Sequence, residues 1–161
     1  MKKLIYTLII IIALTNNSFS AGTSSNSSAD SSDYTKAKIL IKAAKKYEKK
    51  GKVEKAQKRY AKAQKLLLKS NKKKPLQADT LNYLGFTTRK LGDYEKGEEF
   101  YLQGLQIEPD HIGINEYLGE LYIATNRLDL AKERLEILKS CNCKEYKQLK
   151  EIIDGTKKSK Y

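Results

Sequence analysis

The sequence predicts an all-α fold: three helical hairpins stacked side by side and followed by a capping helix. One observation is internal periodicity, since residues 78–111 and 112–145 share a pattern of apolar and small residues at a spacing of 34 residues. A second is that apolar residues in these stretches recur every three or four positions, the period of an amphipathic helix. The third is composition: two Pro, two Cys and one long apolar run in 161 residues exclude a collagen, a disulfide-dense miniprotein and a multi-span membrane protein.

The first element along the chain, residues 1–20, is typical of a signal peptide. Two lysines precede an apolar run over residues 4–14, which is the usual order of such segments. Ser18 and Ser20 suit cleavage before Ala21, and the apolar run is short for a bilayer span. We therefore expect an exported, periplasmic protein, with an uncleaved N-terminal membrane anchor as the open alternative.

Residues 21–33 are nearly all Ser, Gly, Asn and Asp. This composition buries too little apolar surface to offset the entropy of an ordered chain. We expect these residues to form a flexible leader before the repeat domain, which we place at residues 34–155.

The stretch 78–111 shows the marks of one particular repeat. Leu84-Gly85 lies in its first half, and Gly92-Asp93-Tyr94 supplies a turn midway. Tyr101 and Pro109 follow in the second half. These positions resemble the tetratricopeptide repeat (TPR), which is 34 residues long and folds as two antiparallel helices. The resemblance implies a solenoid of stacked hairpins, each burying its apolar stripes against its neighbours.

The other two hairpins are predicted at 37–70 and 112–145. Apolar, small and turn residues fall in both at the register of the central repeat. We expect Gly85, Gly119 and Ala44 to lie where the two helices of one hairpin cross, because a larger side chain would force the helix axes apart.

Two features complete the stack. The seven residues 71–77, NKKKPLQ, are expected to lengthen the loop between the first two hairpins. Residues 145–154 have apolar side chains at helical spacing, so we predict a capping helix there that ends at Gly155. A basic tail follows at 156–161.

Several blocks along the chain together resemble a group of small exported bacterial TPR proteins. The blocks are the signal segment, the Ser-rich leader, LNYLGFTTRKLGDYEKG, HIGINEYLGELYIATNRLDLAKERL and a two-Cys segment followed by Glu-Tyr. This resemblance implies membership of that group, with a partner-binding role of a generic kind. It implies no particular reaction or partner.

Positive charge is concentrated in the first predicted hairpin. The chain has 32 Lys and Arg against 19 Asp and Glu, and 17 of the basic residues lie between Lys36 and Lys74, where only Glu48 and Glu54 are acidic. Such a surface attracts anionic membranes or acidic proteins through forces that salt weakens. We expect no nucleic-acid partner, because the protein is expected to leave the cytoplasm and Arg is scarce. The plainer alternative is that these lysines are solvated helix surface.

Stacked hairpins present their first helices on one concave face, which is the expected binding surface for a protein or peptide partner in the cell envelope. We expect Lys45, Asn82 and Arg89 to hold a carboxylate or an extended backbone, with Phe86 as an apolar anchor. Two glutamates further along would exclude acidic segments. The predicted partner-binding set is Lys38, Ile41, Lys45, Asn82, Phe86, Arg89, Glu116 and Glu120.

Cys141 and Cys143 follow the third hairpin with one residue between them. Because export favours oxidation, a disulfide between them would lock the loop or orient the capping helix. Thiol redox chemistry, or metal binding together with His111, are the remote alternatives, and His111 is otherwise expected to cap a helix or to be solvated. The common phosphate-loop, zinc-protease and serine-hydrolase motifs are missing from the sequence. We therefore expect no enzyme activity, no metal and no cofactor.

Overall fold

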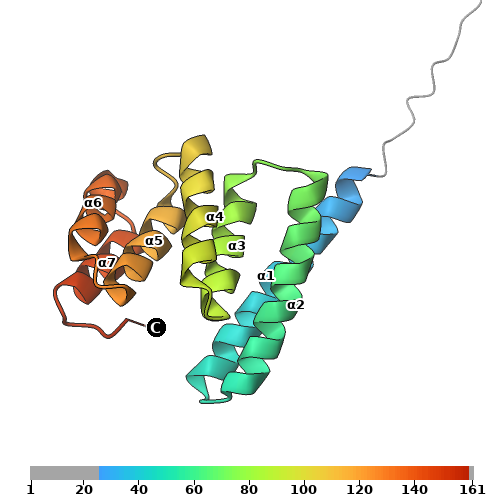
Figure 1. The fold of residues 1–161 in the computed structure, drawn as a ribbon, viewed down its shortest axis with the longest axis horizontal. Coiled ribbons are helices and arrows are strands. Elements are labelled where there is room, and N and C mark those ends of the chain that lie inside the picture. The colour runs from blue at the N-terminus through green and yellow to red at the C-terminus, as the bar shows by residue number, and fades with distance from the viewer. Residues whose placement is uncertain (1–25, 160–161) are drawn as a thin grey trace, which may run out of the picture.

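The computed structural model describes residues 26–159, and it arranges the helices of this part as successive antiparallel pairs (Figure 1). The predicted all-helical solenoid of three hairpins and a capping helix is confirmed. The predicted signal peptide, residues 1–20, lies outside the described residues. The elements are α1 (Asn26–Lys49), α2 (Val53–Lys73), α3 (Ala78–Lys90), α4 (Tyr94–Ile107), α5 (Ile112–Ala124), α6 (Leu128–Leu138), the short 3-10 helix η1 (Lys139–Cys141) and α7 (Lys144–Ile153).

The central helix α3 is the most enclosed element of the stack. Ten of its thirteen residues are buried, because α3 packs on α2 and α4 and also contacts α1 and α5. The first hairpin closes on small side chains that let its two helices approach closely. These are Ala37 and Ala44 on α1 and Ala56 and Ala63 on α2, each at most 1% exposed. Over residues 26–159, no helix has both the length and the apolar character needed to span a membrane.

The turns inside the three hairpins confirm the register of the repeat. Gly51, Gly92 and Asn126 have positive φ angles of 68°, 100° and 59°, a left-handed conformation that favours Gly and, next, Asn. Asn126 lies 34 residues after Gly92, whereas Gly92 lies 41 residues after Gly51. The difference equals the seven inserted residues, so the same turn recurs at each expected position.

The insertion at 71–77 differs from its prediction. Only part of it is loop, because α2 continues to Lys73 and makes the first hairpin longer than the other two. Helix α2 has 21 residues against 14 in α4 and 11 in α6, so its residues 67–73 have no counterpart in the later second helices. The lengthened α2 supplies a surface for the beginning of α1.

The predicted flexible leader is wrong for residues 26–33, and its residues 21–25 lie outside the described part of the chain. Helix α1 begins at Asn26, so residues 26–33 are helical. The contacts of Asp33 give the reason: its buried carboxylate lies 3.2 Å from Lys69 Nζ and 3.0 Å from Lys73 Nζ. Both lysines belong to the extended part of α2, which therefore holds the start of α1 through a contact between residues far apart in the sequence.

The small residues at the helix crossings have two different neighbours. A Cβ atom built on Gly85 would lie 2.5 Å from the ring of Tyr101, across the α3–α4 crossing of one hairpin, as predicted. Gly119 instead faces Leu149 of α7, at 2.6 Å from a built Cβ. The prediction that Gly119 lies at the crossing of α5 with α6 is therefore wrong. Its neighbour is α7, which packs on α5 in the way that the first helix of a fourth hairpin would.

Helix α7 is the capping helix that the sequence predicts at 145–154. Its apolar side is buried against α5 and α6 through Leu149 and Ile152. Gly155 follows it with a φ of 72°, and its amide donates to the carbonyl of Ile152. The left-handed glycine ends the helix at the expected residue.

Replacing Gly85 by Ala is expected to lower the free energy of unfolding by about 1–3 kcal/mol. The new methyl group would press on the fully buried ring of Tyr101, which has no room to move. Gly104→Ala is the matched control, because its methyl group would meet the Cδ1 end of Ile114, a flexible side chain that can rotate. Urea unfolding followed by circular dichroism measures both variants. Equal losses would contradict this explanation of Gly85.

Candidate functional site

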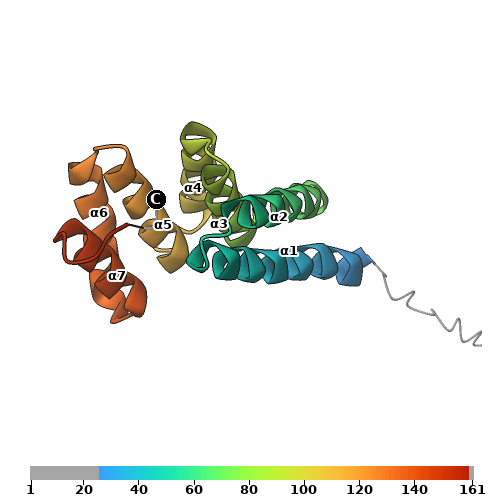
Figure 2. The same ribbon diagram turned by 90° about the horizontal axis from the view of Figure 1, so that it is seen from below.

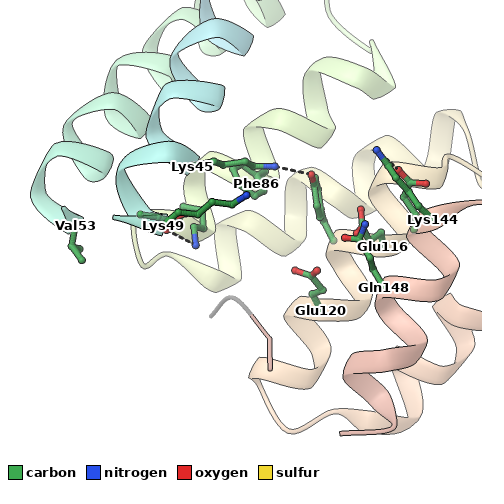
Figure 3. Close-up of a pocket in the computed structure, with 12 residues that line it drawn as sticks. Lys45, Lys49, Val53, Phe86, Glu116, Glu120, Lys144 and Gln148 are labelled. Atoms are coloured by element: carbon green, nitrogen blue, oxygen red, sulfur yellow. Dashed lines mark hydrogen bonds and ion pairs between the residues drawn. The ribbon is translucent and has the colours of Figure 1, made fainter. Parts of the chain in front are cut away.

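The face built by the first helices of the hairpins contains a pocket of about 570 Å³. Helices α1, α3 and α5 contribute to it, and α7 adds a fourth wall in the place of a further first helix (Figure 3). The predicted binding face is thus a real surface of the stack. The pocket is lined by Lys45, Glu48, Lys49, Val53, Phe86, Lys90, Glu116, Tyr117, Glu120, Lys144, Glu145 and Gln148.

Two aromatic rings and one lysine lie together in the pocket. The rings of Phe86 and Tyr117 are 5.0 Å apart between centroids. Lys45 Nζ lies 4.3 Å from the centroid of the Phe86 ring and donates a hydrogen bond to Tyr117 Oη at 3.1 Å. Burial lowers the pKa of the Lys45 ammonium and raises that of the Tyr117 phenol. This arrangement offers an apolar surface with a cation held against it.

The charges around these rings are divided between two sides. On the side of α1 and α3, the pocket is lined by Lys45, Lys49 and Lys90. Figure 3 shows Lys45 and Lys49 across the pocket from Glu116 and Glu120. The side of α5 and α7 is mainly acidic, because Glu145 joins these two glutamates and Lys144 is its one lining cation.

Glu48 is the acidic residue on the basic side, and other groups already engage it. Its Oε1 atom lies 2.6 Å from Lys90 Nζ. Its Oε2 atom accepts a hydrogen bond of 2.8 Å from the hydroxyl of Tyr60. Because Lys90 of α3 and Tyr60 of α2 hold the Glu48 carboxylate in the pocket wall, this side of the pocket stays mainly basic.

Arg89 lies behind the pocket and joins the second hairpin to the third. Its side chain is fully buried, Nη1 donates to the carbonyl of Tyr117 at 2.8 Å, and Nη2 lies 3.4 Å from Glu120 Oε2. The guanidinium carbon also lies 5.2–5.9 Å from the centroids of the Phe86, Tyr101 and Tyr117 rings. Arg89 therefore positions the pocket residues and is closed to a partner.

The structure brings together half of the predicted binding set. Lys45, Phe86, Glu116 and Glu120 line the pocket, and Phe86, Glu116 and Glu120 form its floor, where they are only 3–6% exposed. The other four residues, treated next, do not.

For Ile41, Asn82 and Arg89, the prediction of an accessible position is wrong. Ile41 belongs to the core at 3% exposure, and Asn82 is 6% exposed with its amide against Gly113. Each of these side chains lies where its helix packs on the neighbouring helices of the stack, so that it is covered. Lys38 is exposed but lies outside the pocket, with its ammonium 5.2 Å from the centroid of the Tyr34 ring.

Sequence reasoning missed most of the remaining pocket residues. The sequence does not identify Tyr117, because apolar residues fall on several sides of the helix at 112–124 and leave its orientation open. The sequence does not identify Lys144, Glu145 and Gln148 either, because a capping helix gives no reason to place its side chains on the inner face. The sequence signal that would identify these three residues is the similarity of α7 to the first helix of a hairpin. A first helix at this place would continue the inner face.

The cysteines and the histidine occupy separate places. The structure joins Cys141 and Cys143 by a disulfide in the turn before α7, where Cys143 is the N-cap residue. His111 caps α5: its Nδ1 accepts a hydrogen bond of 3.1 Å from the amide of Ile114. The capping interpretation of His111 is confirmed. In the part of the chain that the structure describes, no three His, Cys, Asp or Glu residues are grouped so as to hold a metal ion.

Arg89→Met is expected to lower the free energy of unfolding by about 3–5 kcal/mol, because it removes this cation from the buried carboxylate of Glu120. The double variant Arg89→Met with Glu120→Met is expected to recover most of that loss, since it removes both buried charges. Chemical denaturation of the two single variants and the double variant measures this coupling. If the loss of unfolding free energy in the double variant equals the sum of the losses in the two single variants, the two residues are not coupled and the explanation is wrong.

Comparisons with known proteins agree with the repeat at the centre of the stack. Residues 78–111 match the family model described as tetratricopeptide repeat, the stretch predicted from the sequence. The chain is 38% identical over 73 residues to a protein of Clostridium acetobutylicum described as the Sol locus transcriptional repressor. That match covers 43% of this chain and 23% of the relative, so the chain spans about a quarter of that relative's length.

Among solved structures, the chain is similar to one described as the crystal structure of MamA. The sequences are 19% identical, and the match covers 84% of this chain and 88% of the other with a TM-score of 0.42. Together with the seven-helix order of the described residues, the family match shows that this chain is a helical solenoid containing a TPR.

Proposed function

We propose that this chain is a non-enzymatic scaffold that captures a segment of another protein in the pocket formed by α1, α3, α5 and α7. Stacked helical repeats use such extended inner faces to bind partners. The observation that carries the proposal is the pocket itself: the aromatic pair Phe86 and Tyr117 lies between a basic and an acidic side. Volumes of this size accept a few side chains or a small ligand.

The division of charge indicates which segment fits. An aromatic or aliphatic side chain would pack on the half-buried ring of Tyr117, which the buried ring of Phe86 supports from beneath. A carboxylate would lie toward Lys45 and Lys49, and a cationic side chain toward Glu145. The preferred partner is therefore an apolar residue with an acidic residue on one side and a basic residue on the other. Segments with two like charges would place one of them against its own sign.

The proposal includes the compartment. The signal-peptide pattern at residues 1–20 supports export and a partner in the cell envelope. The Clostridium acetobutylicum relative is described as a transcriptional repressor, and the shared stretch is 23% of it. From this match we infer only that a segment similar to part of this chain is used within a larger regulatory protein. We infer no repressor activity for this chain.

Capture in the pocket is tested by photo-crosslinking in cells. A photoreactive residue at Gln148, which lines the pocket, is expected to form a discrete adduct with a protein of the envelope fraction. The same residue at Gln103, exposed on α4, is the control. Mass spectrometry of the recovered chain also reads its N-terminus, which is expected to be Ala21.

A charge exchange in the pocket is expected to remove the adduct at Gln148. Lys49→Glu combined with Glu145→Lys preserves the net charge but reverses both sides of the pocket. Lys132→Glu with Glu136→Lys makes the same exchange on α6, and should leave the adduct unchanged. An adduct that survives the pocket exchange would overturn the proposed site. Separately, recovery of the chain in the membrane fraction with residues 1–20 still present would overturn its export as a cleaved protein.

Short peptides test the proposed ligand class. A peptide with a Phe between an Asp and a Lys is expected to bind about tenfold more tightly than peptides with two Asp or two Lys in those places. Glu145→Lys is expected to shift the preference toward the doubly acidic peptide, because it replaces an acidic lining residue with a cation. Fluorescence anisotropy measures the affinities. Equal affinity for the three peptides would contradict selection by the two charged sides.

A further inference from the structure

The outer side of the first hairpin carries a continuous basic face that is separate from the pocket. On α2, six exposed lysines follow one another at intervals of three and four residues, so they lie on one side of the helix. Over this span the row is roughly 25 Å long at the helical rise of 1.5 Å per residue. The row consists of Lys55, Lys58, Lys62, Lys65, Lys69 and Lys72.

Helix α1 widens this row into a face. Its exposed lysines Lys36, Lys42 and Lys46 lie on the side of α1 that points away from the core, and the exposed Lys50 follows in the turn after α1. Between the two helices, the guanidinium carbon of Arg59 on α2 lies 5.8 Å from the centroid of the Tyr47 ring on α1. We define the basic face as the α2 row together with Lys36, Lys42, Lys46 and Lys50.

The basic face is directed away from the rest of the stack. The opposite side of α2 meets α3, where the amide of Gln64 donates to Thr88 Oγ1 at 2.7 Å. Figure 2 shows α1 and α2 at one end of the solenoid, with α3 next to them on one side only. The basic face is therefore the free end surface of the repeat stack.

Carboxylates compensate little of this charge. Among the residues with described side chains on α1 and α2, the acidic ones are Asp33, Glu48 and Glu54. Asp33 pairs with Lys69 and Lys73, and Glu48 is engaged at the pocket by Lys90. The face thus keeps a strong positive field that reaches about 10 Å into solvent at moderate salt.

We propose that the basic face binds the surface of an anionic lipid bilayer. Lysine is a compact, strongly hydrated charge that attracts phosphate headgroups without a fixed geometry. Two antiparallel helices side by side present a broad row of such charges to a planar surface. Ile39, which is 63% exposed on the lysine-bearing side of α1, adds an apolar side chain at the depth of the headgroups.

The composition of the face favours lipid over other polyanions. Protein interfaces are depleted of Lys and enriched in aromatic residues and Arg, the reverse of this surface. Nucleic-acid readers depend on Arg for base contacts, and Arg59 is the one arginine of this hairpin and lies against Tyr47.

Binding to lipid is compatible with capture in the pocket. The pocket uses Lys45, Glu48 and Lys49 on the inner side of α1, and none of them belongs to the basic face. Both surfaces can therefore be occupied at once, and the membrane inference does not depend on the proposed function.

Vesicle co-sedimentation tests the inference with the protein purified from the cells that produce it. Wild-type protein is expected to bind vesicles of phosphatidylcholine with phosphatidylglycerol, to bind pure phosphatidylcholine weakly, and to dissociate as salt rises. The variant Lys55→Glu, Lys58→Glu, Lys62→Glu and Lys65→Glu is expected to lose binding by about tenfold or more. The same four positions changed to Gln should lose less, and provide a second variant in case the first fails to fold.

The matched control reverses four exposed lysines elsewhere: Lys132, Lys139, Lys147 and Lys158 to Glu. It changes the net charge equally and should reduce binding by less than about twofold. An equal loss in the control would show that net charge alone acts, and would overturn the assignment to this face. Binding to polyglutamate or duplex DNA with none to anionic vesicles would also overturn it. The pocket exchange Lys49→Glu with Glu145→Lys should bind vesicles like the wild type, which separates this result from the test of the pocket.

Discussion

The arrangement of the second and third hairpins depends on the buried guanidinium of Arg89. The Arg89 side chain extends from the end of α3 to α5, where it contacts the backbone carbonyl of Tyr117 and the carboxylate of Glu120. A buried charge is stable only with its partners in place, so the relative position of these two helices is tightly specified. The same contact fixes Tyr117 and Glu120 as pocket walls, which makes the geometry of the pocket a consequence of the core beneath it.

Small side chains set how closely the helices around this contact can approach. Gly85 allows Tyr101 to lie against α3, and Gly119 allows Leu149 of α7 to lie against α5. Because α7 is seated in this way, it extends the inner face by one helix and contributes Glu145 and Gln148 to the pocket. The capping helix therefore protects the end of the core and also completes the wall of the pocket.

The first hairpin separates two surfaces of different chemistry. Lys45 is partly buried on the inner side, where an aromatic ring and a phenol hold it. The lysines of the basic face are solvated on the outer side, where their hydration and long reach suit a diffuse anionic surface. One residue type thus has two roles on the same helix, and the position of each lysine around the helix axis decides between them. If both proposals hold, the two surfaces would place a captured protein segment beside a membrane.

The sequence by itself determined the fold class, the three hairpins, the register of the turns and the end of α7, because the 34-residue pattern and its glycines act locally. It also identified the inner face and four pocket residues, since helical period alone assigns a side chain to a face. Only the tertiary structure decided that Arg89, Asn82 and Ile41 lie beneath that face and that residues 26–33 continue α1. These outcomes depend on how closely neighbouring helices pack and on contacts such as that of Asp33 with Lys73, which join residues 40 positions apart in the chain and leave no local pattern to read.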